Sequence, residues 1–405
     1  MDNLQTDANL FADDTSLVEV VLDPLVSANR LNHDLRMVGE WSDQWLVTFN
    51  PLKTELMTFS MKRVKVYHPP LVFKGVVLKE VDSHKHLGLN LKRDLSWSYH
   101  VSTLITKAMK RINLLKRISY FVPRGTLETL YVTMIRPLLE YADIVWCGLL
   151  GKDCDLLESV QMAAARVCTG AMRGTKHESL LAEVAWDTLA DRRKKHQLIQ
   201  FWKIMNGLAP LYLHNIIPPR ICDTVPYNLR ANQNLTSIAC KTEKYKRSFL
   251  PSTVHLWNEL PTNAKAVLSI NTFKKELDSL FNKPTKYSHF SYGQGRSAVH
   301  LTRLRLNFSQ LNYHLFQHHC IDYPTCKCGY HCETTEHYLL HCTLYTSQRS
   351  SLLSAVSNII VDLKHLNDTT LCTLLLSGST SLSHQQNCNI FDLVITYIHC
   401  TGRFS

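Results

Sequence analysis

Apolar and polar residues alternate in short runs along the first hundred residues, and apolar residues recur every three or four positions through much of the remainder. Two short strands joined by a tight turn are predicted over residues 10–22, because acidic residues tolerate turn geometry and the apolar flanks favour strands. A helix is predicted over residues 27–41 from apolar residues at helical spacing. Further strands are predicted over residues 46–49 and 56–60, and residues 61–97 predict a small antiparallel sheet.

From residue 101 to about residue 202 the pattern is helical. The first helix has an apolar face formed by Val101, Leu104, Ile105, Ala108, Ile112 and Leu115. A second helical stretch over residues 127–146 is expected to break or kink at Pro137, which lacks a backbone donor. Residues 283–297 are predicted to form a linker, after which an Arg-rich helix opens at His300. The pattern therefore predicts an α+β fold with strands near the N-terminus and helices over most of the rest.

Composition indicates a globular protein with a polyanionic partner. The 405 residues are enough for roughly two or three domains, and 45% hydrophobic and 20% charged residues are ordinary values. A net charge of +11 favours nucleic acid or an anionic membrane surface as a partner. No apolar stretch approaches the ~18–20 residues of a membrane span, and the acidic, polar start does not predict a signal peptide. We therefore expect an intracellular protein of the cytoplasm or nucleus that is neither secreted nor membrane-bound.

The turn near the N-terminus contains two adjacent carboxylates, Asp13 and Asp14. Such a turn can direct both side chains at one point, where hard oxygen ligands would hold Mg2+. In two-metal phosphoryl transfer the ions sit roughly 3.5–4 Å apart and stabilise the attacking and leaving oxygens. A pair of aspartates in a surface turn is more often only a solvated turn, so both interpretations stay open on these residues alone.

Ordered motifs follow this turn along the chain. They are Phe11-Ala12-Asp13-Asp14, Trp41 with Trp45, the run Phe49-Asn50 with Lys53-Thr54-Glu55, His86-Leu87-Gly88, the run 136–146, and a Cys/His cluster near the end. In this order they resemble the reverse transcriptases of non-LTR (LINE-type, jockey-like) retrotransposons. In that family the acidic turn lies in the polymerase palm, and the helices that follow form a thumb.

The resemblance implies a role for each part of the chain. Residues 1–97 would be a partial palm, a β-hairpin plus helix with a primer-grip-like region, and residues 98–205 a mainly α-helical thumb-like region. Residues 206–298 would be a connector, and residues 299–405 would contain the Arg-rich helix, a small zinc knuckle and a closing helix. Asp13 and Asp14 would be catalytic ligands of Mg2+. Lys53 would lie near the incoming triphosphate, although a solvated turn lysine is the alternative.

Two basic stretches are candidate contacts to nucleic-acid phosphates. The first is on the helix that starts near residue 101 and comprises Lys107, Lys110, Arg111 and Arg117. The second is a run of four cations, Arg192, Arg193, Lys194 and Lys195. Such a run repels itself, so we expect these side chains to be exposed. In a thumb they would lie along the duplex backbone, whereas an ordinary solvated basic face is the alternative.

A second chemical cluster lies near the C-terminus, in the spacing C-x-C-x8-H-x4-C. Its candidate ligands are Cys326, Cys328, His337 and Cys342. Thiolate and imidazole donors at this density suit tetrahedral Zn2+, although free buried thiols are the alternative and Cys332 or His341 could substitute. The helix must end or bend before residue 342. The metal site would have a structural role, or it would help bind single-stranded nucleic acid through Tyr330 and Tyr338.

A polymerase palm needs a third carboxylate on an earlier strand, and only 12 residues precede Asp13. We therefore expect the fingers and that strand to be absent, and some apolar strand faces to be exposed. One hypothesis is that the chain is the C-terminal part of an RNA-directed DNA polymerase. It would extend an RNA or DNA template-primer with deoxynucleotides only when a missing N-terminal segment is supplied. The alternative is a non-catalytic nucleic-acid-binding remnant.

Overall fold

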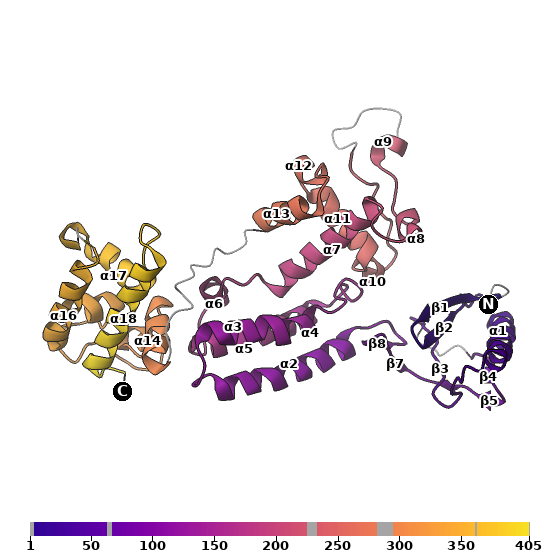
Figure 1. Ribbon diagram of the computed structural model, residues 1–405, viewed down its shortest axis with the longest axis horizontal. Helices are drawn as coiled ribbons and strands as arrows, with labels where there is room; N and C mark the ends of the chain where they lie inside the picture. Colours follow the sequence, from indigo (N-terminus) through magenta and orange to yellow (C-terminus); the bar gives the residue numbers. More distant parts are fainter. Residues whose placement is uncertain (1–3, 63–66, 225–232, 282–294, 361–362, 405) are drawn as a thin grey trace. The chain divides into compact units, whose positions relative to one another are not determined.

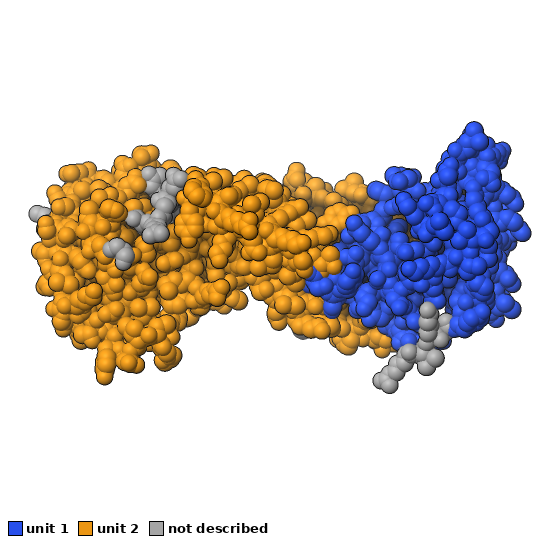
Figure 2. Space-filling model, turned by 90° about the horizontal axis from the view of Figure 1, so that it is seen from below, with its two compact units in different colours: residues 1–102 blue, residues 103–405 orange. Residues whose placement is uncertain are grey.

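The computed structural model divides the chain into two compact units, residues 1–102 and residues 103–405 (Figure 2). The residues that it describes are 4–62, 67–224, 233–281, 295–360 and 363–404. Within these ranges no helix is both long and apolar enough to span a membrane. Part of the predicted linker at 283–297 lies outside the described residues. Each unit is described by itself below.

The first unit begins with the predicted hairpin. Strand β1 (Asp7–Phe11) pairs antiparallel with β2 (Asp14–Val18), and Phe11 lies opposite Asp14. The tight turn between the strands contains Ala12, whose φ of 53° is in the left-handed region. Helix α1 (Pro24–Gln44) follows and is capped by Asp23, whose side chain accepts hydrogen bonds from two backbone amides of the first turn.

The remaining strands of this unit are short. They pair as β3 (Glu55–Leu56) with β6 (Lys79–Glu80), β4 (Val72–Phe73) with β5 (Val76–Val77), and β7 (Ser83–His86) with β8 (Leu89–Lys92). The predicted strand over residues 46–49 is wrong, because Leu46 has φ 57° just after α1 and residues 46–49 are not in a strand. Of the predicted strand over 56–60, only Leu56 is in a strand. A small core forms where α1 packs on β4, from Ala28, Leu31, Leu35, Val38, Leu71, Phe73 and Leu78.

Helices make up the described part of the second unit (Figure 1). The unit boundary falls within α2 (Ser98–Ile118). The predicted break near Pro137 is confirmed: α3 (Arg124–Leu130) passes through a π-helical turn, η1 (Tyr131–Ile135), into α4 (Arg136–Glu140). This stretch ends at Glu140, so the predicted helix over residues 141–146 is wrong.

Helix α7 (Leu189–Met205) is central to the next group of helices. It packs against α5 (Gly151–Thr169), α11 (Phe249–Glu259) and α13 (Ile270–Leu280). Its aromatic residues join those of α11 and α13 in one core. The shorter helices of this region are α6 (His177–Val184), α8 (Leu211–Asn215), α9 (Ile221–Thr224), α10 (Glu243–Lys246) and α12 (Thr262–Lys265).

The C-terminal helices surround α18 (His384–Thr401), which begins with a capping box of Ser383 and Gln386. Three helices pack against it: α14 (Gly295–Arg305), α16 (Thr346–Ser357) and α17 (Asp368–Ser377). The shorter elements are α15 (Asn312–Gln317), η3 (His337–His341), η4 (Thr343–Tyr345) and η5 (Leu363–His365). Their apolar side chains form one cluster.

A buried charge network connects three helices of the second unit. The carboxylate of Glu183, in α6, accepts from Arg124 of α3 at 2.6 Å and from Arg305 of α14 at 2.7 Å. Arg124 also donates to Glu128 at 2.8 Å. Burial acts to lower the pKa of Arg124, but the two carboxylates beside it raise that pKa overall. All four side chains are almost fully buried.

Removal of the Glu183 carboxylate should therefore be costly. We expect Glu183→Ala to lower the free energy of unfolding by about 3–5 kcal/mol, because two buried guanidinium groups lose their counter-charge. Urea denaturation followed by circular dichroism measures this change. The control is Glu243→Ala, which removes an exposed pair with Lys246 and should cost less than about 1 kcal/mol. Equal losses in the two variants would contradict the assignment.

Candidate metal centre and acidic hairpin

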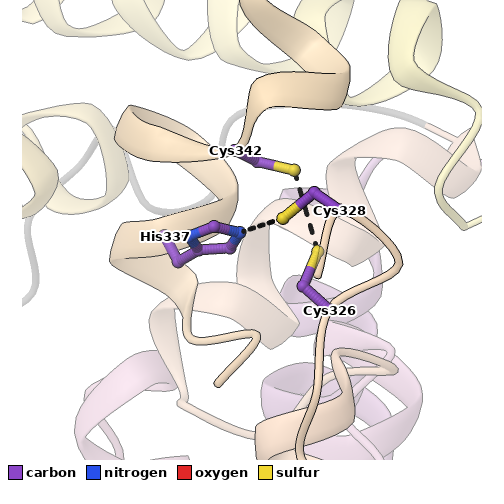
Figure 3. Close-up of side chains that lie close together, drawn as sticks. All are labelled: Cys326, Cys328, His337 and Cys342. Carbon is purple, nitrogen blue, oxygen red and sulfur yellow. Dashed lines mark hydrogen bonds between the residues drawn. The ribbon is translucent and has the colours of Figure 1, made fainter. Parts of the chain in front are cut away.

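The first two cysteines of the cluster lie in a tight turn. The backbone amide of Gly329 donates to the carbonyl of Cys326 at 3.0 Å, and that of Cys326 donates to the carbonyl of Tyr330 at 2.9 Å. Gly329 has φ 89°, a conformation that favours a residue without Cβ. The turn presents Cys326 and Cys328 toward His337 and Cys342 (Figure 3).

The other two candidate ligands lie at the start of η3 and just beyond its end. The amide of Cys342 donates to the carbonyl of His337 at 2.7 Å, which closes a π-turn across five residues. Cys342 then leaves the helix with ψ 123°. The helix therefore ends before residue 342, as the spacing predicts. Because a π-turn is wider than an α-helical turn, it brings His337 and Cys342, five positions apart, onto the same side of η3.

The distances between the four ligand atoms are close to those of a tetrahedral site. With Zn–S about 2.3 Å and Zn–N about 2.0 Å, ligand atoms around Zn2+ lie roughly 3.5–3.8 Å apart. Here the two Sγ atoms of Cys326 and Cys342 are 3.7 Å apart, and Cys328 Sγ lies 3.3 Å from His337 Nε2. All four ligand atoms lie within 4.8 Å of one another. The residues therefore fit Zn2+.

The pKa shifts of His337 and Cys328 favour metal binding, whereas burial favours the protonated thiols of Cys326 and Cys342. Burial lowers the pKa of His337, which favours the neutral imidazole whose lone pair can bind a metal ion. Burial raises the pKa of Cys326 to about 12 and also raises that of Cys342. For Cys328 burial acts in the same direction, but hydrogen bonds from the Tyr330 amide and from the neighbouring thiols lower its pKa overall. A bound cation would replace the thiol protons.

The two alternative ligands lie outside this group. Cys332 is not among the four converging residues. His341 instead lies near Glu336 and Asp368, and its Nε2 is 3.0 Å from an Asp368 carboxylate oxygen. The structure thus brings together the set Cys326, Cys328, His337 and Cys342.

Distant residues support the turn that carries the cysteines. Glu333 is buried and accepts from both the Nε and an Nη of Arg403, at 2.7 and 2.6 Å. The second oxygen also accepts from the Asn312 amide at 2.7 Å. These supporting residues were not predicted, because Arg403 lies 70 residues from Glu333 and no local spacing connects them.

The two tyrosines beside the cluster differ in exposure. Tyr338 is fully buried, and its hydroxyl lies 2.7 Å from Thr401 Oγ1 in the core against α18. Base stacking through Tyr338 is therefore a wrong expectation. Tyr330 is 47% exposed and stacks on His337 with ring centroids 4.4 Å apart, so it covers one side of the candidate site.

The acidic hairpin forms as predicted, but the described residues do not complete a metal site there. Asp13 and Asp14 are exposed at the turn between β1 and β2, and Lys53 is exposed in the turn that starts at Asn50. Among the residues that the structure describes, no converging group of three or more His, Cys, Asp or Glu includes either aspartate. By themselves these residues do not fit a two-metal Mg2+ site.

The predicted cations of α2 are exposed. Lys107, Lys110 and Arg117 extend into solvent from the face opposite the buried apolar residues of the helix. Arg111 is also exposed and donates to the backbone carbonyl of Met134. Three of the four side chains on this face thus have no intramolecular role that fixes them in the described structure.

The expectation of a fully exposed run at residues 192–195 is wrong. Arg193 and Lys195 are buried, because α7 packs against other helices on more than one face. Lys195 pairs with Asp187 and Asp278, both at 2.9 Å. Arg192 pairs with Glu140, and Lys194 is paired with Asp191 at 3.2 Å on the surface. The charges of this run are largely neutralised within the protein.

Three polymerases of Drosophila melanogaster transposable elements are similar to this chain. The probable RNA-directed DNA polymerase from transposon BS is 25% identical over 205 residues, 47% of this chain and 22% of that protein. The corresponding protein from transposon X-element is 26% identical over 212 residues, 49% of this chain and 22% of its own length. The RNA-directed DNA polymerase from mobile element jockey is 26% identical over 168 residues, 40% of this chain and 18% of its own length.

The chain spans less than a quarter of the length of these relatives. No protein-family model and no solved structure matches it. The resemblance predicted from the motifs is confirmed: about half of this chain is similar to part of the RNA-directed DNA polymerases of non-LTR retrotransposons.

Proposed function

We propose that this chain is a nucleic-acid-binding part of an RNA-directed DNA polymerase, with an RNA or DNA template-primer as its partner. The similarity to three such polymerases over about half the chain carries this proposal. The exposed cations of α2 and the net charge of +11 support it, because neutralisation of phosphates supplies much of the affinity for nucleic acid.

In this proposal the first unit is a partial palm and α2 belongs to a thumb-like region. Asp13 and Asp14 would act as catalytic carboxylates, and Lys53 would lie near a bound triphosphate; the motifs that contain these residues support both roles. Since no third carboxylate joins the aspartates within the described ranges, nucleotidyl transfer needs a further acidic residue from another polypeptide segment. Deoxynucleotides would be substrates only of that completed site.

The second candidate function is nucleic-acid binding without catalysis. The observation that favours it is the same incomplete acidic site at the hairpin. In this case α2 would still bind the phosphate backbone, and the two aspartates would form only a solvated turn. The two candidates therefore share their binding surface and differ in whether Asp13 and Asp14 are used.

The four Cys/His residues would hold one structural Zn2+. The ligand distances and the lowered pKa of His337 support this. All four protein ligands are supplied by the chain, so the site leaves no open position for a substrate. Zn2+ would tie the turn at residues 326–330 to the end of η3 and so to α16 and α17.

Loss of one ligand should release the ion and loosen these helices. We expect the purified chain to contain about one zinc, and Cys342→Ser to lose it with a fall in the thermal unfolding midpoint. Elemental analysis and circular dichroism provide the two readouts. Cys332→Ser is the matched control, because that thiol lies outside the four-residue group and should keep the ion. Equal zinc content in the two variants would refute the ligand set.

Nucleic-acid binding should depend on α2 and on salt. We expect the combined change of Lys107, Lys110 and Arg117 to Gln to weaken binding to a primer-template duplex. The slope of log affinity against log salt should become less steep by about two to three, because each lost phosphate contact removes about 0.9. Fluorescence anisotropy at several salt concentrations measures both effects.

The matched control changes three exposed lysines elsewhere, Lys152, Lys274 and Lys275, to Gln. It removes the same net charge, so a general charge effect would change both triple variants equally. Unchanged affinity and slope in the α2 variant would rule out this surface as the binding site.

A further inference from the structure

Two adjacent aromatic side chains protrude where α2 ends. Helix α2 stops at Ile118, and the amide of Phe121 donates to the Ile118 carbonyl at 2.9 Å, which closes a turn. In this turn Tyr120 is 72% exposed and Phe121 is 78% exposed. Large apolar side chains lose their burial free energy when they stay in water, so a neighbouring pair of this kind marks a contact surface.

The turn lies between two well-anchored elements. On one side, α2 buries Ile112 and Leu115 near its end. On the other side, Pro123 leads into α3, whose first residue is the buried Arg124 of the Glu183 network. The aromatic pair is therefore presented from a fixed position between two helices, which lowers the entropy lost when a ligand stacks on it.

The charge around this pair is entirely positive in the local sequence. From Leu95 to Leu127 the sequence contains no Asp or Glu. Lys116 and Arg117 are exposed in the last turn of α2, directly before the aromatic residues. An apolar protein partner would gain nothing from these cations, whereas a polyanion with flat apolar groups matches both features.

The basic face of α2 leads toward the aromatic pair. Lys107, Lys110 and Arg117 follow one another at three- and seven-residue steps and so share one helix face. Ten residues of helix are about 15 Å long, the length of roughly four phosphates at duplex spacing. A nucleic-acid strand whose phosphates follow this face would reach Tyr120 and Phe121. Only an unpaired base could present its π-face to these side chains.

We propose that Tyr120 and Phe121 form a stacking platform for unpaired bases of a single-stranded nucleic acid whose phosphates lie along α2. This inference rests on the proposed nucleic-acid-binding function and adds the form of the ligand. Aromatic platforms of this kind are tolerant of sequence, because every base offers a π-face. RNA and DNA share this chemistry.

The test compares a thymidine 12-mer with an abasic 12-mer of equal charge, by fluorescence anisotropy with the full chain. We expect the double change Tyr120→Leu with Phe121→Leu to weaken binding to the thymidine oligonucleotide at least about fivefold. Affinity for the abasic oligonucleotide should not change, because it lacks the group that stacks. Phe121→Trp should retain the affinity, and a uridine 12-mer compares RNA with DNA.

Each other outcome overturns the platform. Equal loss on the two 12-mers, or no loss on either, would show that the aromatic pair does not recognise bases. Self-association of the wild-type chain that disappears in the leucine variant would assign the pair to a contact between copies. If the wild-type chain binds neither oligonucleotide, the proposed nucleic-acid-binding function is rejected as well. The α2 triple variant should lose affinity for both oligonucleotides, which separates phosphate contact from base stacking.

Discussion

The carboxylate of Glu183 lies buried between the guanidinium groups of Arg124 and Arg305, and the packing of the second unit depends on this neutralised charge. The three side chains come from α3, α6 and α14, and Arg305 also donates to the backbone carbonyl of Leu376 at 2.6 Å. A charge left without its partner in such an interior costs several kcal/mol. The same network fixes the start of α3, and with it the aromatic turn that precedes Arg124.

The described residues of the first unit form a smaller core. Seven buried residues around α1 and β4 form its core, while large apolar side chains near the acidic hairpin stay in water, such as Phe11 at 64% and Leu22 at 93% exposure. Exposed apolar strand faces were expected for a palm that lacks its other strands. The proposed partial palm of residues 1–97 rests on the motifs around the acidic hairpin and agrees with these exposed apolar side chains.

Features set by nearby residues could be predicted from the sequence. The hairpin around Asp13, the exposed cations of α2 and the converging Cys/His residues all depend on local turn chemistry, helical spacing and ligand spacing. Features set by distant contacts could not. Lys195 is buried because Asp278 supplies its counter-charge from 83 positions away, and Tyr338 is buried because α18 packs over it. Composition alone predicts neither, since the same residues would be exposed on an isolated helix.

In the proposed function, Asp13 and Asp14 lie in a palm that needs a further acidic residue from another polypeptide segment. The most direct measurement is primer extension on an RNA template with the purified chain, Mg2+ and deoxynucleotides, beside the double variant Asp13→Asn and Asp14→Asn. We expect no incorporation above that of the variant, although both proteins should bind the primer-template equally. Incorporation by the wild-type chain that is lost in the double variant would contradict it.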